Sequence, residues 1–471
     1  MRPAPTRRAI EMTAPETHRS IAPSRLDRTL RVFTQVRAGE GAPALLLIAS
    51  VFLILCAYYV LKTVREGLIL TGGMAGLRGD ELKVYAAGLM ALLLLAVIPA
   101  YGALADRVGR LRLLNVSYAV VLGCLGGFYA LGQAGAPIGL AFFVWLGIVS
   151  VFLVAQFWSY ANDVFDAEQG KRLFAVVAIG GAAGAIAGPR IAGLAGTYPL
   201  LVVAGGLLAA ALALLNVVDR LQAGRRPALP APAEPIGGPG GFALVLRDRY
   251  LLCIAGAALV ANLVNTTGEF VLSSYAADLA RDVEGEAERR EVIKAFYADF
   301  FFWVNLASFL VQSFLVSRII GRIGIRGALY VLPALALGAY ALVAMVGGLG
   351  LVRVAKTAEN ATDYSLQNTV RQSLFLPTAR AVKYKAKAAV DTFFVRFGDM
   401  LSAILVGVAL HSFGASGRQL ALVNVGLIAV WLLLVAGIAR RHAALDPAAP
   451  ALALPATSPA PVISVAAGAR S

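Results

Sequence analysis

The run ALLLIASVFLILCAYYVL, residues 44–61, decides the class of protein that this chain forms. It contains no charged residue, and a helix of roughly 20 apolar residues is long enough to cross the hydrocarbon core of a bilayer. Backbone N–H and C=O groups find no water there, so the run must bond internally as an α-helix. Similar runs recur along all 471 residues, of which 59% are hydrophobic and 15% charged. The sequence therefore predicts an all-α integral membrane protein, with the lipid bilayer as its surroundings.

The spacing of the apolar runs predicts about twelve transmembrane helices in two sets of six. Proline and glycine dominate residues 225–241, RRPALPAPAEPIGGPGG, and prevent a regular helix between the two sets. The first six helices are expected at residues 44–70, 84–104, 113–131, 138–162, 173–194 and 200–218. The second six are expected at residues 250–279, 296–320, 328–346, 349–374, 389–413 and 420–439.

These spans divide the chain into two helix bundles with flexible connections. Two six-helix bundles joined by a linker are typical of secondary transporters built from repeated units. The predicted parts are a cytoplasmic N-terminal arm (1–43), a first bundle (44–218), a cytoplasmic linker (219–247), a second bundle (248–440) and a disordered cytoplasmic tail (441–471).

The loops between the helices assign an orientation. The net charge is +15, and cytoplasmic loops of membrane proteins carry an excess of Lys and Arg, so we attribute this charge to topology and expect no nucleic-acid partner. With a cytoplasmic N-terminus, the basic loops near residues 107–112, 318–326 and 380–387 all fall on the cytoplasmic side. The acid-rich stretch 278–294 then lies on the opposite side. We predict a monomer in the cell inner (plasma) membrane, with both termini cytoplasmic.

A gating motif is expected between the second and third helices, in residues 102–112, GALADRVGRLR. Its glycines allow close helix approach and a tight turn, and its acid can pair with arginines in one state and release them in another. The alternative is an ordinary basic loop. The motif resembles the loop signature of the major facilitator superfamily, except that Leu111 replaces a final basic residue. The residues assigned to the gate are Gly102, Asp106, Arg107, Gly109 and Arg110.

The second bundle contains an echo of this motif at residues 317–326, SRIIGRIGIR. The echo keeps the glycines and arginines but lacks the aspartate. Its position after the eighth predicted helix matches that of the first motif after the second helix, which favours an internal duplication.

Ionisable residues inside the predicted spans are candidates for a transport site, because such groups cost about 2.5–3.5 kcal/mol at the bilayer centre. The first helix contains Lys62, Arg65 and Glu66, and the spacing of Lys62 and Glu66 allows them to pair on one helix face. One interpretation is a cationic cavity wall that binds an anionic solute. The other is an ion cluster near the outer membrane face.

The fourth and seventh helices add polar groups of a different kind. Gln156 and Asn162 accompany Trp158 and Tyr160 near the end of the fourth helix, where they could bind a ring-bearing ligand or form an interfacial aromatic belt. The seventh helix contains Asn265 and Glu269. We interpret Asn265 as a hydrogen-bonding group and Glu269 as a proton carrier, with an ion pair to the first helix as the alternative for Glu269.

The tenth helix, residues 349–374, is the most polar predicted span. It contains Lys356, Glu359 and Asn360 among further charged and amide side chains, so it cannot face lipid. We expect it to line a cavity, where Lys356 and Asn360 bind substrate and Glu359 carries a proton. The first, fourth, seventh and tenth helices line the central cavity of the major facilitator superfold.

No motif indicates an enzyme, a cofactor or a metal site. The chain has no phosphate-binding P-loop, no zinc-protease motif and no nucleophile elbow, and its three histidines are scattered. The glycine-rich run IGGAAGAIAG, residues 179–188, lies in an apolar span, where small residues favour helix packing rather than nucleotide binding.

Several blocks resemble the ATP/ADP translocase family of plastids and intracellular bacteria. The blocks are residues 61–68 (LKTVREGL), 157–174 (FWSYANDVFDAEQGKRLF), 373–378 (SLFLPT) and 385–391 (KAKAAVD). The resemblance implies a nucleotide or related phosphorylated anion that is exchanged or moved with protons.

The chain departs from that family at positions that carry charge. Arg65 stands where the family has a lysine, and an apolar residue near 144–146 replaces a glutamate. Asn265 takes the place of an acid, with Glu269 one turn later, and Asp399 takes the place of a lysine. These departures put strict ATP/ADP exchange in question but leave the architecture intact.

Three hypotheses follow. The first is a nucleotide carrier that works by alternating access. The second is a major facilitator carrier or exporter of another amphiphilic or anionic solute. The third is a membrane scaffold that keeps the fold without transport, which the gate-like motif at residues 102–112 disfavours.

Overall fold

The computed structural model describes residues 37, 39–74, 76–105, 107–222, 239–379 and 382–445, which are almost entirely helical. The first part contains α2 (Gly41–Thr71), α3 (Gly79–Ala105), α4 (Arg110–Gln133), α5 (Gly139–Val164), α6 (Ala167–Ala192) and α7 (Thr197–Gln222). The second contains α8 (Gly241–Arg247), α9 (Arg249–Leu279), α10 (Glu286–Leu310), α11 (Val316–Ala328), α12 (Val331–Met345), α13 (Leu349–Thr362), α14 (Asn368–Ser373), α15 (Lys387–Ala389), α16 (Val395–Phe413) and α17 (Gly417–Leu445). Short π-helical segments interrupt the second part: η1 (Val311–Leu315), η2 (Asp363–Gln367), η3 (Val382–Ala386) and η4 (Val390–Phe394).

Ten helices in the described residues are long and apolar enough to cross a membrane. The two remaining predicted spans do not meet this criterion, one because of its length and the other because of its charge. Helix α12 is apolar but only 15 residues long. The continuous helical stretch 349–373, made of α13, η2 and α14, carries charges along its length. The polarity of this stretch agrees with the expectation that it does not face lipid.

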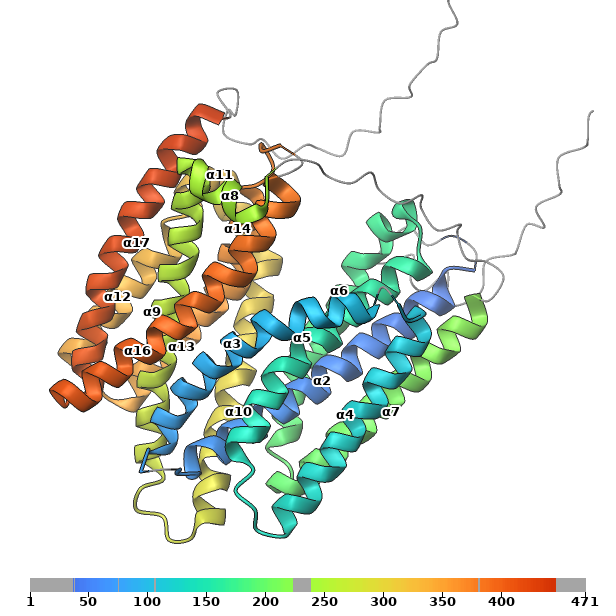
Figure 1. Cartoon of the computed structure of the whole chain (residues 1–471), viewed down its shortest axis with the longest axis horizontal. Coiled ribbons are helices and arrows are strands. Elements are labelled where there is room, and N and C mark those ends of the chain that lie inside the picture. Colours follow the sequence, from blue (N-terminus) through green and yellow to red (C-terminus); the bar gives the residue numbers. More distant parts are fainter. Residues whose placement is uncertain are drawn as a thin grey trace, which may run out of the picture.

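The helices form two groups that meet mainly at one end (Figure 1). Helices α2–α7 make up the first group, and α9–α17 make up the second. The groups approach each other where α2 ends and α10 begins, and they lie further apart at the opposite end. We call the first of these the closed end and the second the open end.

Helices α2 and α6 pack backbone against backbone through three glycines spaced four residues apart. A Cβ added at Gly180 would lie 2.6 Å from the Ile48 carbonyl oxygen, and one at Gly188 would lie 2.5 Å from the Cys56 carbonyl oxygen. A Cβ at Gly184 would overlap the Phe52 carbonyl oxygen. The glycine-rich run at residues 179–188 is therefore a helix-packing surface, as the sequence indicated.

The variant Gly184→Ala tests this packing. An added methyl group has no room against the α2 backbone, so we expect the melting temperature of the purified protein to fall by several degrees. The matched control is Gly126→Ala in α4, where an added Cβ meets no heavy atom of the described residues within 4 Å. This control should melt at or slightly above the wild-type temperature, because alanine favours helix by about 1 kcal/mol. Equal melting temperatures for the two variants would contradict the packing.

The start of α2 is fastened to the start of α6 by a carboxylate. Asp166 and Gln169 form a reciprocal capping box at the N-terminus of α6. One turn further, Arg172 donates to both oxygens of Glu40 at 2.8 and 3.0 Å. Burial raises the pKa of the Glu40 carboxyl, but the hydrogen bonds from Arg172, the Arg37 backbone and Gln169 outweigh that effect and hold the pKa below its usual value.

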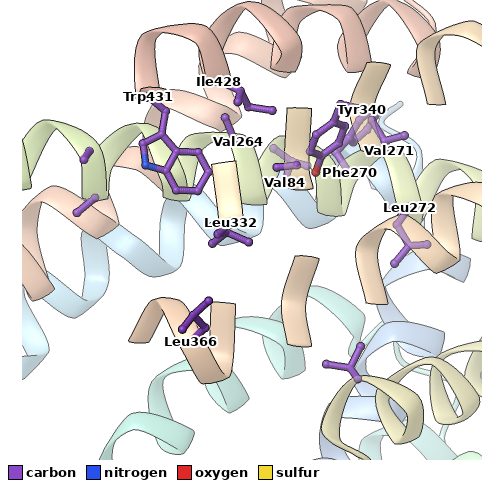
Figure 2. Packing of buried hydrophobic residues seen from close by; sticks show 14 of the residues in the cluster. Val84, Val264, Phe270, Val271, Leu272, Leu332, Tyr340, Leu366, Ile428 and Trp431 are labelled. Carbon is purple, nitrogen blue, oxygen red and sulfur yellow. The ribbon is translucent and has the colours of Figure 1, made fainter. Parts of the chain in front are cut away.

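The second group has its own apolar core, which extends across to the first. Figure 2 shows Ile428 and Trp431 of α17 beside Val264 of α9 and Leu332 of α12. The same cluster of buried residues includes Ile69 at the end of α2 and further residues at the start of α3. Apolar contact between the two groups is thus built into the closed end.

Helix α10 begins earlier than the sequence suggested and supplies polar contacts at the closed end. The stretch 278–294 was expected to be a loop, but α10 starts at Glu286, after Gly285 with φ 88°. In the sequence alone the acidic residues indicate a loop, but acidic side chains also stabilise the first turn of a helix, as Glu286 and Glu288 do here. Glu291 accepts hydrogen bonds from both the backbone N–H and the hydroxyl of Thr197 in α7, and Lys294 donates to the Ala195 carbonyl oxygen.

Candidate functional site

A buried carboxylate in α2 binds two basic side chains near the closed end. Glu66 is 1% exposed, and its oxygens lie 2.5 Å from the Arg65 guanidinium and 2.7 Å from Lys83 Nζ in α3. Lys83 also donates to Ser273 Oγ in α9 at 2.7 Å and lies 4.0 Å from Glu269 of the same helix. These contacts join α2 and α3 of the first group to α9 of the second.

The second group contributes a further set of charges around Lys356. Its ammonium is 1% exposed and lies 3.0 Å from Glu359 and 3.7 Å from Glu269. Lys356 donates to Asn265 Oδ1 at 2.9 Å, and Asn360 donates to Glu269 at 3.1 Å. Helix α12 completes the set, because Tyr340 donates to Glu359 at 2.8 Å. We call these six charged residues the ion network: Arg65, Glu66, Lys83, Glu269, Lys356 and Glu359.

Lys62 lies beside the ion network and makes no ion pair with the described residues. Its ammonium is 4.3 Å from the centroid of the Phe301 ring and 5.3 Å from that of Tyr59, which are cation–π distances. The predicted pairing of Lys62 with Glu66 is wrong, because Arg65 and Lys83 occupy that carboxylate. The ion network contains three bases and three acids, and Lys62, whose charge also acts on Glu269, adds one further positive charge beside it.

A cavity of about 600 Å³ lies next to Lys62 between the two helix groups. A volume of this size falls within the usual range for small-molecule sites. Its walls combine aromatic rings, amides and hydroxyls with the single ammonium of Lys62. The polar and aromatic residues of the wall are Tyr58, Tyr59, Lys62, Asn305, Ser308, Phe309, Gln312, Tyr364, Asn368 and Thr369.

The cavity and the ion network are adjacent because both use one face of α2. Tyr58, Lys62 and Glu66 are spaced four residues apart, which places them about 6 Å apart along that face. Tyr58 lines the cavity, Glu66 belongs to the ion network, and Lys62 stands between them. The helix therefore leads from an aromatic environment to a charged one.

Two predicted binding residues lie apart from this arrangement. Gln156 in α5 donates to the hydroxyls of Tyr101 and Ser117, both at 2.7 Å. Asn162 is exposed near the end of α5 and is not among the cavity residues. The fourth predicted span therefore places neither residue here. Asn265, Lys356 and Asn360 lie in or against the ion network, and none of these three lines the cavity.

Only part of the expected gating motif can be described. Asp106 and the side chain of Arg110 lie outside the described residues, and Arg107 is exposed. A Cβ at Gly102 or Gly109 would meet no heavy atom of the described chain within 4 Å. In this conformation these two glycines do not mark a close helix contact.

Sequence reasoning missed Lys83 and Tyr340. Lys83 directly precedes the predicted second span, which begins at residue 84, but α3 already begins at Gly79. Tyr340 lies in an apolar stretch where a single hydroxyl gave no signal. Asp399, noted only as a family departure, accepts hydrogen bonds from Asn262 at 2.6 Å and Thr266 at 2.7 Å. No group of three or more His, Cys, Asp or Glu in the described ranges is placed to hold a metal ion.

The variant Glu66→Gln tests the ion network. It leaves Arg65 and Lys83 without their carboxylate in a buried place, which typically costs 3–5 kcal/mol. We expect a clearly lowered melting temperature in detergent. The matched control is Glu168→Gln, which removes an exposed pair with Arg37 and should cost less than about 1 kcal/mol. Similar losses in both variants would show that Glu66 is not a structural centre.

Comparison with known families places this geometry in context. Residues 42–358 match the family model of the Major Facilitator Superfamily, and residues 328–442 match that of the TLC ATP/ADP transporter. The first match covers about two thirds of the chain, and the second lies in its C-terminal part. Both models describe transport proteins, in agreement with the prediction that the chain is not an enzyme.

The curated relatives are ADP/ATP carriers at low identity. ADP,ATP carrier protein 1 of Chlamydia pneumoniae is 24% identical over 341 residues, which cover 60% of this chain and 63% of that protein. Its counterpart from Chlamydia trachomatis is 28% identical over 334 residues, which cover 60% of this chain and 61% of that protein. The chain thus matches less than two thirds of the length of these relatives, and the predicted family resemblance is confirmed as a distant one.

Solved structures share the fold. A mutant of the nucleoside transporter NupG superposes with a TM-score of 0.59 at 15% identity, over 86% of this chain and 99% of that one. A bacterial homologue of the iron transporter ferroportin, in an inward-facing state, superposes with a TM-score of 0.61 at 12% identity, over 84% and 98%. At these identities the likeness concerns the fold alone, and it confirms the predicted fold class.

Proposed function

Because this chain belongs to the major facilitator superfamily, a family of secondary transporters, we propose that it carries a nucleotide or related phosphorylated anion by alternating access between its two helix groups. The observation that carries this proposal is the position of Lys62. Its ammonium makes no ion pair with the described residues, although its charge acts on Glu269 of the network, and it stands where the aromatic cavity meets the ion network. An anionic ligand in the cavity would supply the missing negative charge.

The cavity wall suits the base and sugar of a nucleotide. Tyr58 and Tyr364 offer ring faces on which a base can stack, and Tyr364 is 43% exposed. The exposed amides of Gln312 and Asn368 offer donors and acceptors for base edges and sugar hydroxyls. A purely inorganic anion would leave most of these groups unused.

The phosphates would then lie toward Lys62 and the ion network. An ammonium to phosphate contact is a charge-assisted hydrogen bond, which is stronger than a neutral one. Arg65, assigned to anion binding from the sequence, already contacts Glu66 at 2.5 Å, so we assign it to positioning that carboxylate in this conformation. Lys356 is likewise engaged by Glu359 and Asn265.

Alternating access is supported by where the two groups touch. Contacts at the closed end include Thr197 with Glu291, Lys83 with Ser273, and the Ile69 region of the apolar core. Asn305 donates to the Ala185 carbonyl oxygen beside the cavity. We propose that the open end faces the cytoplasm, in the predicted topology with both termini inside and bundles at 44–218 and 248–440. Exchange or proton coupling would use Glu269 or Glu359, both of which contact Lys356.

A second candidate substrate is a different amphiphilic or phosphorylated anion. The observation that favours it is Asp399, an acid at a position where the resemblance implied a lysine, held by Asn262, Thr266 and Arg396. A panel of nucleotides, nucleosides, sugar phosphates and inorganic pyrophosphate, tested by thermal shift and by uptake into proteoliposomes, separates the two candidates. No shift and no uptake for any nucleotide would exclude the first one.

Lys62→Gln should weaken binding of ATP and ADP about tenfold or more, because it removes a charge-assisted contact. The matched variant Lys62→Arg keeps the charge and should retain most of the affinity. Binding is measured by titration of the purified protein, with adenosine as a ligand that lacks phosphate. Equal losses for adenosine and ATP in Lys62→Gln would show that Lys62 does not contact phosphate.

Tyr364→Leu should weaken nucleotide binding through lost stacking, which is worth about 1–3 kcal/mol per base. Tyr364→Phe keeps the ring and should bind nearly as the wild type does. Inorganic pyrophosphate carries no base, so its affinity should be the same in all three proteins. A pyrophosphate affinity that falls together with that of ATP in Tyr364→Leu would point to general damage to the cavity.

A further inference from the structure

Three arginines recur at four-residue intervals along α11 and the segment that ends it. Arg318 and Arg322 share one face of α11 by their spacing and are both exposed, and Arg326 follows the break in the helix at Gly324; we call these three residues the arginine stripe. None of the three makes an ion pair with the described residues. The sequence contains no Asp or Glu between Asp299 and Glu359, so the stripe has no acid on its own or the next helix.

Large exposed apolar side chains adjoin this arginine stripe. Phe314 and Leu315 in η1 are 56% and 45% exposed, and Ile323 within α11 is 50% exposed. Figure 1 places α11 at the open end of the second group, where it packs against α12, α14 and α17. Gly324, with φ 67°, breaks the helix between Arg322 and Arg326. The segment thus presents cations beside apolar groups at the edge of the membrane-spanning helices.

We propose that the arginine stripe is a binding site for the phosphate headgroup of an anionic phospholipid. Guanidinium groups bind phosphate oxygens with two parallel hydrogen bonds, and the adjacent Phe314, Leu315 and Ile323 contact the acyl chains of the same lipid. A free phosphate has no use for the apolar flank, and none of the three arginines lines the substrate cavity. The site is therefore separate from the transport path.

The two related loops of this chain differ in whether an acid accompanies the arginines. The motif at residues 102–112 carries Asp106 among its arginines, whereas the echo at 317–326 keeps the arginines and has no acid. Arginines with an acid in the same loop can be neutralised within the protein. Arginines without one need an external anion, and the headgroups of anionic phospholipids carry phosphate.

The test compares nanodiscs of pure phosphatidylcholine with nanodiscs that also contain phosphatidylglycerol. For the wild type we expect phosphatidylglycerol to raise the melting temperature and to remain bound in native mass spectra, with a rise that shrinks at high salt. The double variant Arg318→Gln with Arg322→Gln should lose most of this rise and retain fewer phosphatidylglycerol molecules. The double variant Arg318→Lys with Arg322→Lys keeps the charge and should lose only part of the rise in melting temperature.

The matched control is Arg281→Gln with Arg289→Gln, two exposed arginines at the closed end. This control removes the same charge and should keep the full phosphatidylglycerol effect. Equal losses in both double variants would overturn the proposal in favour of general electrostatics. A rise of the same size with inorganic phosphate in phosphatidylcholine nanodiscs would overturn it in favour of a soluble anion. No phosphatidylglycerol effect in the wild type would also overturn it.

Discussion

The structure depends on the pairing of charges that are withdrawn from water. Glu66 is almost fully buried, and a buried carboxylate is tolerated only when opposite charges and hydrogen bonds replace its hydration. Arg65 and Lys83 do this from the same helix group, at 2.5 and 2.7 Å. On the other side, Lys356 accompanies Glu269 and Glu359 from within its own group. Every charged group of the ion network thus has an opposite charge inside its own group, although the first group has one more base than acids and the second one more acid than bases.

This arrangement keeps the separation of the groups energetically feasible. When the closed end opens, Lys83 loses Ser273, Tyr297 and the more distant Glu269, but it keeps Glu66. Glu269 keeps Lys356 and Asn360 in the same way. No ion of the network is left without an opposite charge in its own group. Apart from the approach of Lys83 to Glu269 at 4.0 Å, these bonds join the Lys83 ammonium to neutral hydroxyls that water can replace, which suits an interface that must form and part repeatedly.

The sequence was sufficient for the fold because membrane insertion leaves a strong periodic signal. Apolar length predicts about twelve spans, of which ten are long apolar helices in the described residues, and the proline-rich stretch separates the two predicted sets. Side-chain partners were less accessible. The spacing of Lys62 and Glu66 allowed a pair, but Arg65 and Lys83 took the carboxylate, and Lys83 lay one residue outside the predicted span. Gln156 uses its amide for hydrogen bonds to Tyr101 and Ser117 within the first helix group. A single sequence cannot distinguish such a structural amide from one that binds a ligand.

The π-helical segments were also beyond the reach of periodicity, and they shape the cavity. Segment η1 contains Gln312 and η2 contains Tyr364, and both side chains line the cavity wall. A π turn adds one residue and rotates the helix that follows, so the faces before and after it point in different directions. The stretch 349–373 can therefore place Lys356 and Glu359 in the ion network and, after η2, Asn368 in the cavity. In an uninterrupted α-helix, residues 368 and 356 would differ in direction only by the regular turn of about 100° per residue. The π turn thus links the charged and the aromatic parts of one site through a single helix.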